Sequence, residues 1–183
     1  MDYKFKTEPY EHQLHALGAS HNKENFALFM EMGTGKSKVL VDNIAMLYDK
    51  GKINAALIVA PKGVYRNWER QEIPIHMPDH IVHNVVTWSP VTTKKQQKEN
   101  LKLFKHGEQL TIFLMNIEAF STKKGLDIAQ RFLLAHQTLM AIDESTTIKS
   151  PTARRTKNVL KLRNYAKYRR ILTGSPVTKS PLD

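Results

Sequence analysis

Short apolar runs alternate along the chain with segments of helical periodicity, and this alternation limits the fold more than any other feature of the sequence. Runs with the length and composition of buried strands lie at Phe26–Glu31, Ala55–Ala60, Ile81–Trp88, Leu110–Met115, Thr138–Ile142 and Arg170–Leu172. Helical patterns lie at Pro9–Ala19, Lys36–Asp49, Val64–Ile73, Thr92–Lys105, Leu126–Ala135 and Thr152–Lys167. Strands that are joined through helices pair in parallel. The sequence therefore predicts an α/β fold, with a mostly parallel β-sheet flanked by helices on both faces.

The length and composition favour one intracellular domain. A chain of 183 residues is most simply a single domain over residues 1–183. It has no cysteine, which excludes disulfides and thiolate metal sites. Its apolar runs are too short to cross a bilayer, and its first residues lack the apolar stretch of a signal peptide. We therefore expect an intracellular protein, cytoplasmic or associated with nucleic acid, that is not secreted and has no membrane partner.

A glycine-containing loop separates the first apolar run from the helical pattern that follows it. The loop reads Gly33, Thr34, Gly35, Lys36 and Ser37. In such strand–loop–helix units the backbone N–H groups cradle phosphates, the lysine reaches the β- and γ-phosphates, and the serine hydroxyl binds Mg²⁺. The pattern predicts a nucleotide site with Lys36 in a catalytic role and Ser37 as a metal ligand. The usual pattern has a further glycine where this chain has Met30, so a tight turn before a helix remains an alternative.

An acidic pair, Asp143 and Glu144, follows the apolar run Thr138–Ile142. Ligands of open α/β sheets bind outside the carboxyl ends of the strands, where such a pair would lie. We expect Asp143 to hold Mg²⁺ through water and Glu144 to orient or deprotonate an attacking water. The alternative is a pair of solvated carboxylates that end a strand.

Positive charge is concentrated near the end of the chain. The formal net charge is +11, and residues 145–182 hold ten of the 28 lysines and arginines but no acidic residue. Basic residues such as Arg154 and Arg155 are spaced to share the polar face of one helix. This surface favours a nucleic-acid backbone as partner, without base-specific contacts. A solvated helix face, or a surface that another domain covers, remains open.

Five strings of residues follow one another in a fixed order. They are Pro9–Leu14, Glu31–Ser37, Leu57–Lys62 with Asn67 and Trp68, Asp143–Thr146 with Ile148–Pro151, and Leu172–Pro176. Together they resemble the glutamine motif and motifs I, Ia, II and III of the first RecA-like domain of superfamily-two helicases, most closely the Swi/Snf-type DNA translocases. The resemblance covers Pro9 to Asp183 and implies a RecA-like fold, with ATP and Mg²⁺ as ligands and double-stranded DNA as partner.

The resemblance also implies roles that the residues alone do not. Gln13 would read the adenine edge, although an isolated glutamine in this position indicates only an exposed helix residue. Residues implied to contact DNA are Pro61, Lys62 and, with a poorer match, Asn116. Residues implied to couple the nucleotide to the DNA side are Thr173, Gly174 and Ser175.

The chain departs from the family in two ways. Thr146 stands where the family usually has a histidine that couples hydrolysis to motif III. The second RecA-like domain, which would supply catalytic arginines in cis or in trans, is absent from residues 1–183. We therefore expect weak nucleotide binding and very slow turnover by this chain alone. The leading hypothesis is the ATP-binding half of a DNA-dependent ATPase or translocase. The alternatives are a nucleic-acid-binding module with little ATPase activity and a phosphate-loop ATPase of another kind.

Overall fold

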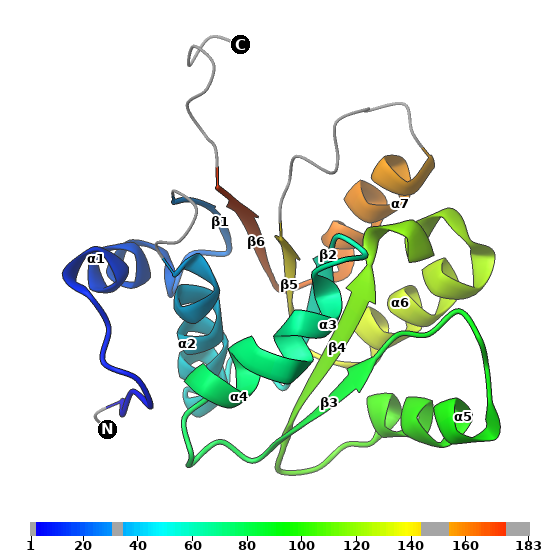
Figure 1. The fold of residues 1–183 in the computed structure, drawn as a ribbon, viewed down its shortest axis with the longest axis horizontal. Helices are drawn as coiled ribbons and strands as arrows, with labels where there is room; N and C mark the ends of the chain where they lie inside the picture. The colour runs from blue at the N-terminus through cyan, green and yellow to red at the C-terminus, as the bar shows by residue number, and fades with distance from the viewer. Residues whose placement is uncertain (1–2, 31–34, 144–153, 175–183) are drawn as a thin grey trace, which may run out of the picture.

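The computed structural model describes residues 3–30, 35–143 and 154–174 (Figure 1). Its centre is one six-stranded sheet with the strand order β1-β6-β5-β2-β4-β3, in which every pair is parallel. The strands are β1 (Asn25–Phe29), β2 (Ala55–Ala60), β3 (His83–Thr87), β4 (Leu110–Asn116), β5 (Thr138–Asp143) and β6 (Tyr168–Thr173). The prediction of an α/β fold with a parallel sheet is confirmed.

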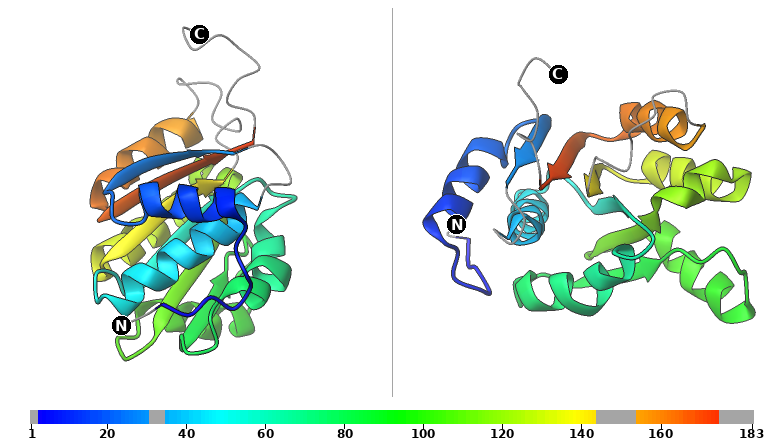
Figure 2. Two further views of the ribbon diagram at one scale, coloured as in Figure 1. Left: turned by 90° about the vertical axis from the view of Figure 1, so that its left-hand side faces the viewer. Right: turned by 45° about the horizontal axis from the view of Figure 1, so that its top comes forward.

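Helices cover both faces of this sheet, as Figure 2 shows. One face carries α1 (Glu11–Ser20), α2 (Lys36–Asp49), α3 (Tyr65–Asn67) and α4 (Ile73–His76). The other side carries α5 (Lys94–Leu101), α6 (Lys123–Ala135) and α7 (Arg154–Leu162). Single turns of 3₁₀ helix lie at Lys102–Phe104, Ile117–Ser121 and Arg163–Tyr165. No helix among the described residues is both long and apolar enough to span a membrane.

Burial on both faces explains why the inner strands read as unbroken apolar runs. Every residue of β2, β4 and β5 is buried. The prediction of α2 was correct to the residue, because its core-facing side chains recur at helical spacing. These are Val39, Leu40, Ile44 and Leu47, none of which is more than 2% exposed. Hydrophobic burial therefore fixes where the phosphate-loop helix sits on the sheet.

The helix predicted over Val64–Ile73 is interrupted by a π-helical turn at Trp68–Glu72. The buried residues of this segment are Tyr65, Trp68, Ile73 and Met77, so one step along the buried face is five residues long. A regular α-helix repeats its face every three to four residues and cannot make that step. The π-helical turn accommodates the five-residue step, because the Ile73 N–H donates to the carbonyl of Trp68, five residues earlier.

Arg170 belongs to the basic end of the chain but does not lie on its surface. Its side chain is 1% exposed. The guanidinium donates to Asn43 Oδ1 at 2.9 Å, to the carbonyl of Ser20 at 2.8 Å and to that of Arg169 at 2.8 Å. Burial lowers the pKa of Arg170 to about 10, so the group stays charged at neutral pH. Arg170 is therefore not among the cations that could face a polyanion, and it fastens β6 to α1 and α2 instead.

Acid is expected to destabilise the fold through His136, which follows α6. Its Nε2 lies 2.5 Å from the carbonyl of Leu103, and burial lowers its pKa below the ordinary 6.5. Below pH 6.5 the unfolded chain binds the proton first, so the free energy of unfolding decreases as the pH falls toward the folded-state value. Urea unfolding of His136→Gln at pH 5.5 and 7.5 should show a smaller pH dependence than wild type. An equal dependence in both proteins would contradict this role.

Candidate nucleotide-binding site

The carboxyl ends of β1, β6 and β5 meet at one edge of the sheet, although they are far apart in the sequence. In the pairing register Phe29 lies opposite Thr173, and Leu172 lies opposite Asp143. The Met30 N–H donates to the carbonyl of Thr173 at 3.3 Å. The sheet thus places the end of the phosphate-loop strand, Thr173 and Asp143 on three adjacent strands. Ligands of parallel sheets bind at this edge.

Several predicted site residues lie outside the described residues, so their predicted roles stay predictions. They are Gly33, Thr34, Glu144, Thr146 and Ser175. The described members are Gln13, Gly35, Lys36, Ser37, Asp143, Thr173 and Gly174. Gly35 caps the N-terminus of α2, and Lys36 and Ser37 form its first turn. The first turn of α2 carries no acidic residue, and the positive end of the helix dipole there favours an anion such as phosphate.

Gln13 is a buried residue rather than an exposed helix glutamine. It is 5% exposed, its Oε1 accepts the Tyr10 N–H at 2.8 Å, and its Nε2 donates to the carbonyl of Gly35 at 3.4 Å. The alternative interpretation of Gln13 is therefore wrong. The side chain joins the start of α1 to the end of the phosphate loop, a contact that ties the glutamine motif to motif I.

Gly35 is required both by its positive φ and by the lack of space for a side chain. Gly51 has only the positive φ, so it allows the two effects to be measured separately. Gly35 has a φ of +79°, and a Cβ added there would collide with Nε2 of Gln13. Gly51 has a φ of +69°, and an added Cβ there meets no atom within 4 Å. Gly51→Ala should therefore lower the free energy of unfolding by about 1–2 kcal/mol through backbone strain alone. Gly35→Ala should cost more in urea unfolding, and equal losses would show that the Gln13 contact is easily displaced.

Asp143 ends β5 and is held by an indole. It is 5% exposed, and the Trp68 Nε1–H donates to its Oδ2 at 3.1 Å. The charge of Asp143 also acts on Glu72. Burial and, second, this charge raise the pKa of the Glu72 carboxyl. The sequence analysis did not predict the bond between Trp68 and Asp143. An indole beside a carboxylate 75 residues away leaves no local pattern.

The donor set fits Mg²⁺ bound together with a nucleotide. The Asp143 carboxylate and the Ser37 hydroxyl offer hard oxygen ligands. The described residues contain no group of three or more acidic, histidine or cysteine side chains able to hold a metal ion. Mg²⁺ normally uses one or two protein oxygens together with phosphates and waters, so Ser37 and Asp143 are the residues that would hold it.

The residues implied to contact DNA lie at the same edge of the sheet but differ in their contacts. Pro61 follows β2, and Asn116 ends β4 opposite Ala60. Asn116 is 7% exposed, and its Oδ1 accepts the Ala119 N–H at 2.9 Å, which caps the turn Ile117–Ser121. Lys62 is exposed.

The basic helix α7 begins near this turn. Arg155 lies 3.9 Å from Glu118, while Arg154 is exposed. Figure 1 shows α7 starting at the same end of the sheet as the arrowheads of β4 and β5. Lys157 and Lys161 are also exposed, whereas Val159 and Leu162 face the core. Leu160, which lies between these two core residues in the sequence, is 36% exposed.

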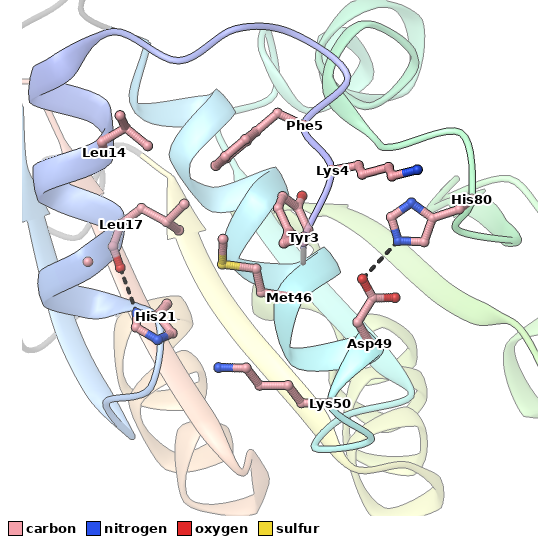
Figure 3. Close-up of a pocket in the computed structure, with 11 residues that line it drawn as sticks. Tyr3, Lys4, Phe5, Leu14, Leu17, His21, Met46, Asp49, Lys50 and His80 are labelled. Carbon is pink, nitrogen blue, oxygen red and sulfur yellow. Dashed lines mark hydrogen bonds and ion pairs between the residues drawn. The ribbon is translucent and has the colours of Figure 1, made fainter. Parts of the chain in front are cut away.

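A hollow lined by described residues lies away from this edge (Figure 3). It has a volume of about 760 Å³ and opens between the N-terminal segment, α1 and the last turns of α2. Its lining includes Phe5, Leu17, Met46 and Lys50, but no described residue of the nucleotide site. Met46 and Lys50 lie at the opposite end of α2 from Lys36. The site is therefore defined by the strand ends and not by this cavity.

Comparison with known proteins identifies relatives of the same fold. The chain is similar to the Sulfolobus solfataricus SWI2/SNF2 ATPase core in complex with dsDNA, with a TM-score of 0.71 and 20% identity over 97% of this chain and 34% of that one. It is similar to the UvsW helicase from Bacteriophage T4, with a TM-score of 0.65 and 12% identity over 94% of this chain and 54% of that one. The chain thus spans about a third to a half of these structures. A search of curated proteins gave no match.

The family is established by the sequence itself. The model of the SNF2-related domain matches residues 12–183, which is nearly the whole chain. The matched region includes Gln13, the start of α2, Asp143 and Thr173, which the structure gathers around one edge of the sheet. The fold shared with the solved structures confirms the predicted RecA-like architecture. The chain therefore belongs to the SNF2-related domain family.

Proposed function

We propose that this chain is the ATP-binding half of a DNA-dependent ATPase or translocase that works inside the cell. The observation that carries the proposal is the meeting of the α2 N-terminus, Asp143 and Thr173 at one sheet edge, in a chain of this family. These three features supply what ATP hydrolysis needs. The α2 N-terminus is an anion site, Asp143 offers a carboxylate for the metal, and Thr173 links the site to the neighbouring strand.

Each residue has a distinct task in the proposed reaction. Lys36 and the first N–H groups of α2 bind and orient the phosphates. Ser37 and Asp143 would hold Mg²⁺, which neutralises charge on the phosphates when it is bound. Glu144 orients or deprotonates the attacking water. We assign Gln13 to the adenine, in addition to its contact with Gly35.

A second RecA-like domain is proposed to complete the site. The first turn of α2, which begins Lys36-Ser37-Lys38, contains no arginine. Such a residue from a partner domain is worth about 10³–10⁵ in rate in related phosphoryl transfer. Hydrolysis of ATP to ADP and phosphate by this chain alone is therefore expected to be very slow. Thr146, Thr173, Gly174 and Ser175 are proposed to couple that hydrolysis to the DNA side.

The proposed DNA partner is the duplex backbone. One similar structure contains dsDNA, and in this chain Lys62 and the polar face of α7 expose cations beside the strand ends. Pro61 would line the same track. Because the Asn116 amide already caps a turn, we propose that Asn116 positions the backbone of Ile117–Ser121 rather than reaching DNA itself.

The proposal is tested by ATP hydrolysis with and without duplex DNA, with Glu144→Gln as the control. We expect binding of Mg·ATP by both proteins and a slow DNA-stimulated turnover that Glu144→Gln removes. Binding of Mg·ATP without turnover would restrict the chain to a half-site that requires its second domain. Absence of nucleotide binding would contradict the proposal and favour the nucleic-acid-binding module, for which the exposed cations of α7 are the supporting observation.

The DNA surface has a matched control on the same chain. The triple variant Arg154→Gln, Lys157→Gln and Lys161→Gln removes three exposed cations from α7. Its binding to duplex DNA should be weaker, with a slope of log affinity against log salt that is shallower by about 2–3. Replacing Lys94, Lys95 and Lys98 on α5 with glutamine removes the same charge from another surface. Equal effects of the two triple variants would show that only net charge matters.

A further inference from the structure

Trp68 and Asp143 form a buried pair at the end of β5. Trp68 is 1% exposed and Asp143 is 5% exposed. The indole N–H donates to Asp143 Oδ2 at 3.1 Å. A hydrogen bond from a neutral donor does not neutralise the charge of a buried carboxylate. It does fix the orientation of that carboxylate. One oxygen of Asp143 is therefore committed to the protein.

The π-helical turn gives this contact its rigidity. Trp68 is the first residue of the turn, and its carbonyl accepts the hydrogen bond from the Ile73 N–H that defines the π-helical turn. Because Tyr65, Ile73 and Met77 are all buried on the same segment, the indole is anchored on both sides along the chain. Irregular helical turns of this kind cost regular hydrogen bonding and are often found at functional sites. Here the turn keeps Trp68 in the core while the segment continues into α4.

We propose that Trp68 is a positioning residue for the metal-binding carboxylate of Asp143. The proposal rests on the proposed function, because it assumes that Asp143 serves Mg²⁺ bound with a nucleotide. Groups that orient a metal ligand through a hydrogen bond raise metal affinity without touching the metal. An indole suits this task because it donates only, carries no charge and has few rotamers. A lysine or arginine in its place would neutralise the carboxylate and compete with the metal.

The first test compares two conservative variants. Trp68→Phe keeps most of the buried volume but removes the N–H. Trp88→Phe makes the same change at a residue that is 4% exposed and follows β3, which β2 and β4 separate from β5. Binding of a fluorescent ADP analogue is measured with and without Mg²⁺. We expect Trp68→Phe to raise the Mg²⁺ concentration needed for half-maximal tight binding by about 10-fold. Affinity without Mg²⁺ should stay within about twofold, since no part of the indole bonds to the nucleotide in the proposal.

The second measurement follows the wild-type chain, and a variant serves only to assign its peaks. The chain has two tryptophans, so a ¹⁵N spectrum has two indole N–H peaks, and Trp88→Phe leaves that of Trp68. Addition of ADP alone should leave the Trp68 peak in place. Addition of Mg²⁺ should then shift it, with the same midpoint as the tighter nucleotide binding, because the metal withdraws charge from the carboxylate that accepts the bond.

The outcomes separate the inference from the function on which it rests. Mg²⁺-dependent ADP binding that is equal in wild type and Trp68→Phe, or a Trp68 peak that ignores Mg²⁺, would overturn the positioning role alone. A wild-type chain whose ADP binding is indifferent to Mg²⁺ would overturn both the positioning role and the proposed metal site. A 10-fold loss in both Trp68→Phe and Trp88→Phe would indicate a general effect on packing and would also overturn the role.

Discussion

Replacing Lys36 with alanine is expected to weaken Mg·ATP binding by about 100-fold while leaving the stability of the fold nearly unchanged. Lys36 opens α2 at the carboxyl edge of the sheet and is partly exposed. A hydrogen bond to a charged group contributes about 1.5–3 kcal/mol, and about 2.7 kcal/mol corresponds to a factor of 100 in affinity. Calorimetric titration with Mg·ATP would measure the affinity, and urea unfolding would measure the stability.

The control for Lys36 lies on the same edge of the sheet. Lys62→Ala removes an exposed lysine from the end of β2 and should leave Mg·ATP affinity unchanged. A loss below about fivefold in Lys36→Ala, or an equal loss in both variants, would indicate that the α2 N-terminus does not bind the phosphates. A loss of stability greater than about 1 kcal/mol would show that Lys36 has a structural task as well.

Replacing Lys38, two residues further along α2, is expected to have the opposite effect to replacing Lys36. It should lower the stability of the fold and leave Mg·ATP affinity nearly unchanged. Its side chain and that of Asp42 are 4% and 2% exposed, and their charged atoms lie 2.8 Å apart. Tyr3 donates its hydroxyl proton to the other Asp42 oxygen at 2.6 Å. Burial, followed by this bond, raises the pKa of Tyr3, so the hydroxyl remains a donor. Lys38→Met leaves the Asp42 charge buried without its ion pair, which should lower the free energy of unfolding by about 3–5 kcal/mol.

A double variant distinguishes loss of an ion pair from loss of packing. Lys38→Met combined with Asp42→Asn removes both charges and keeps an acceptor for Tyr3. Because the penalty of a single removal comes from the stranded charge, the double variant should recover most of the lost stability in urea unfolding. Additive losses would contradict this explanation. Mg·ATP affinity should change little in the folded fraction, in contrast with Lys36→Ala.

How much of the structure the sequence predicts depends on how local each sequence signal is. The bounds of α2 and β2 were predicted to the residue, because helical and strand periodicity are written in neighbouring positions. The helix predicted over Val64–Ile73 is present, but its π-helical turn was not predicted, since a five-residue step in a buried face has no distinct composition. Gln13 was assigned its site through a family resemblance, while its own neighbours favoured an exposed residue that the structure does not have.

The sequence by itself determined the parallel α/β fold, the strand–loop–helix unit before Lys36 and the carboxylate that ends β5. These features depend on periodicity and on motifs of a few adjacent residues. Only the tertiary structure decided which polar groups would be buried. Trp68 meets Asp143 across 75 residues, and Arg170 meets Asn43 across 127. A buried polar group must find a partner wherever the packed elements bring one, so its partner depends on the order of the strands and not on its neighbours in the chain.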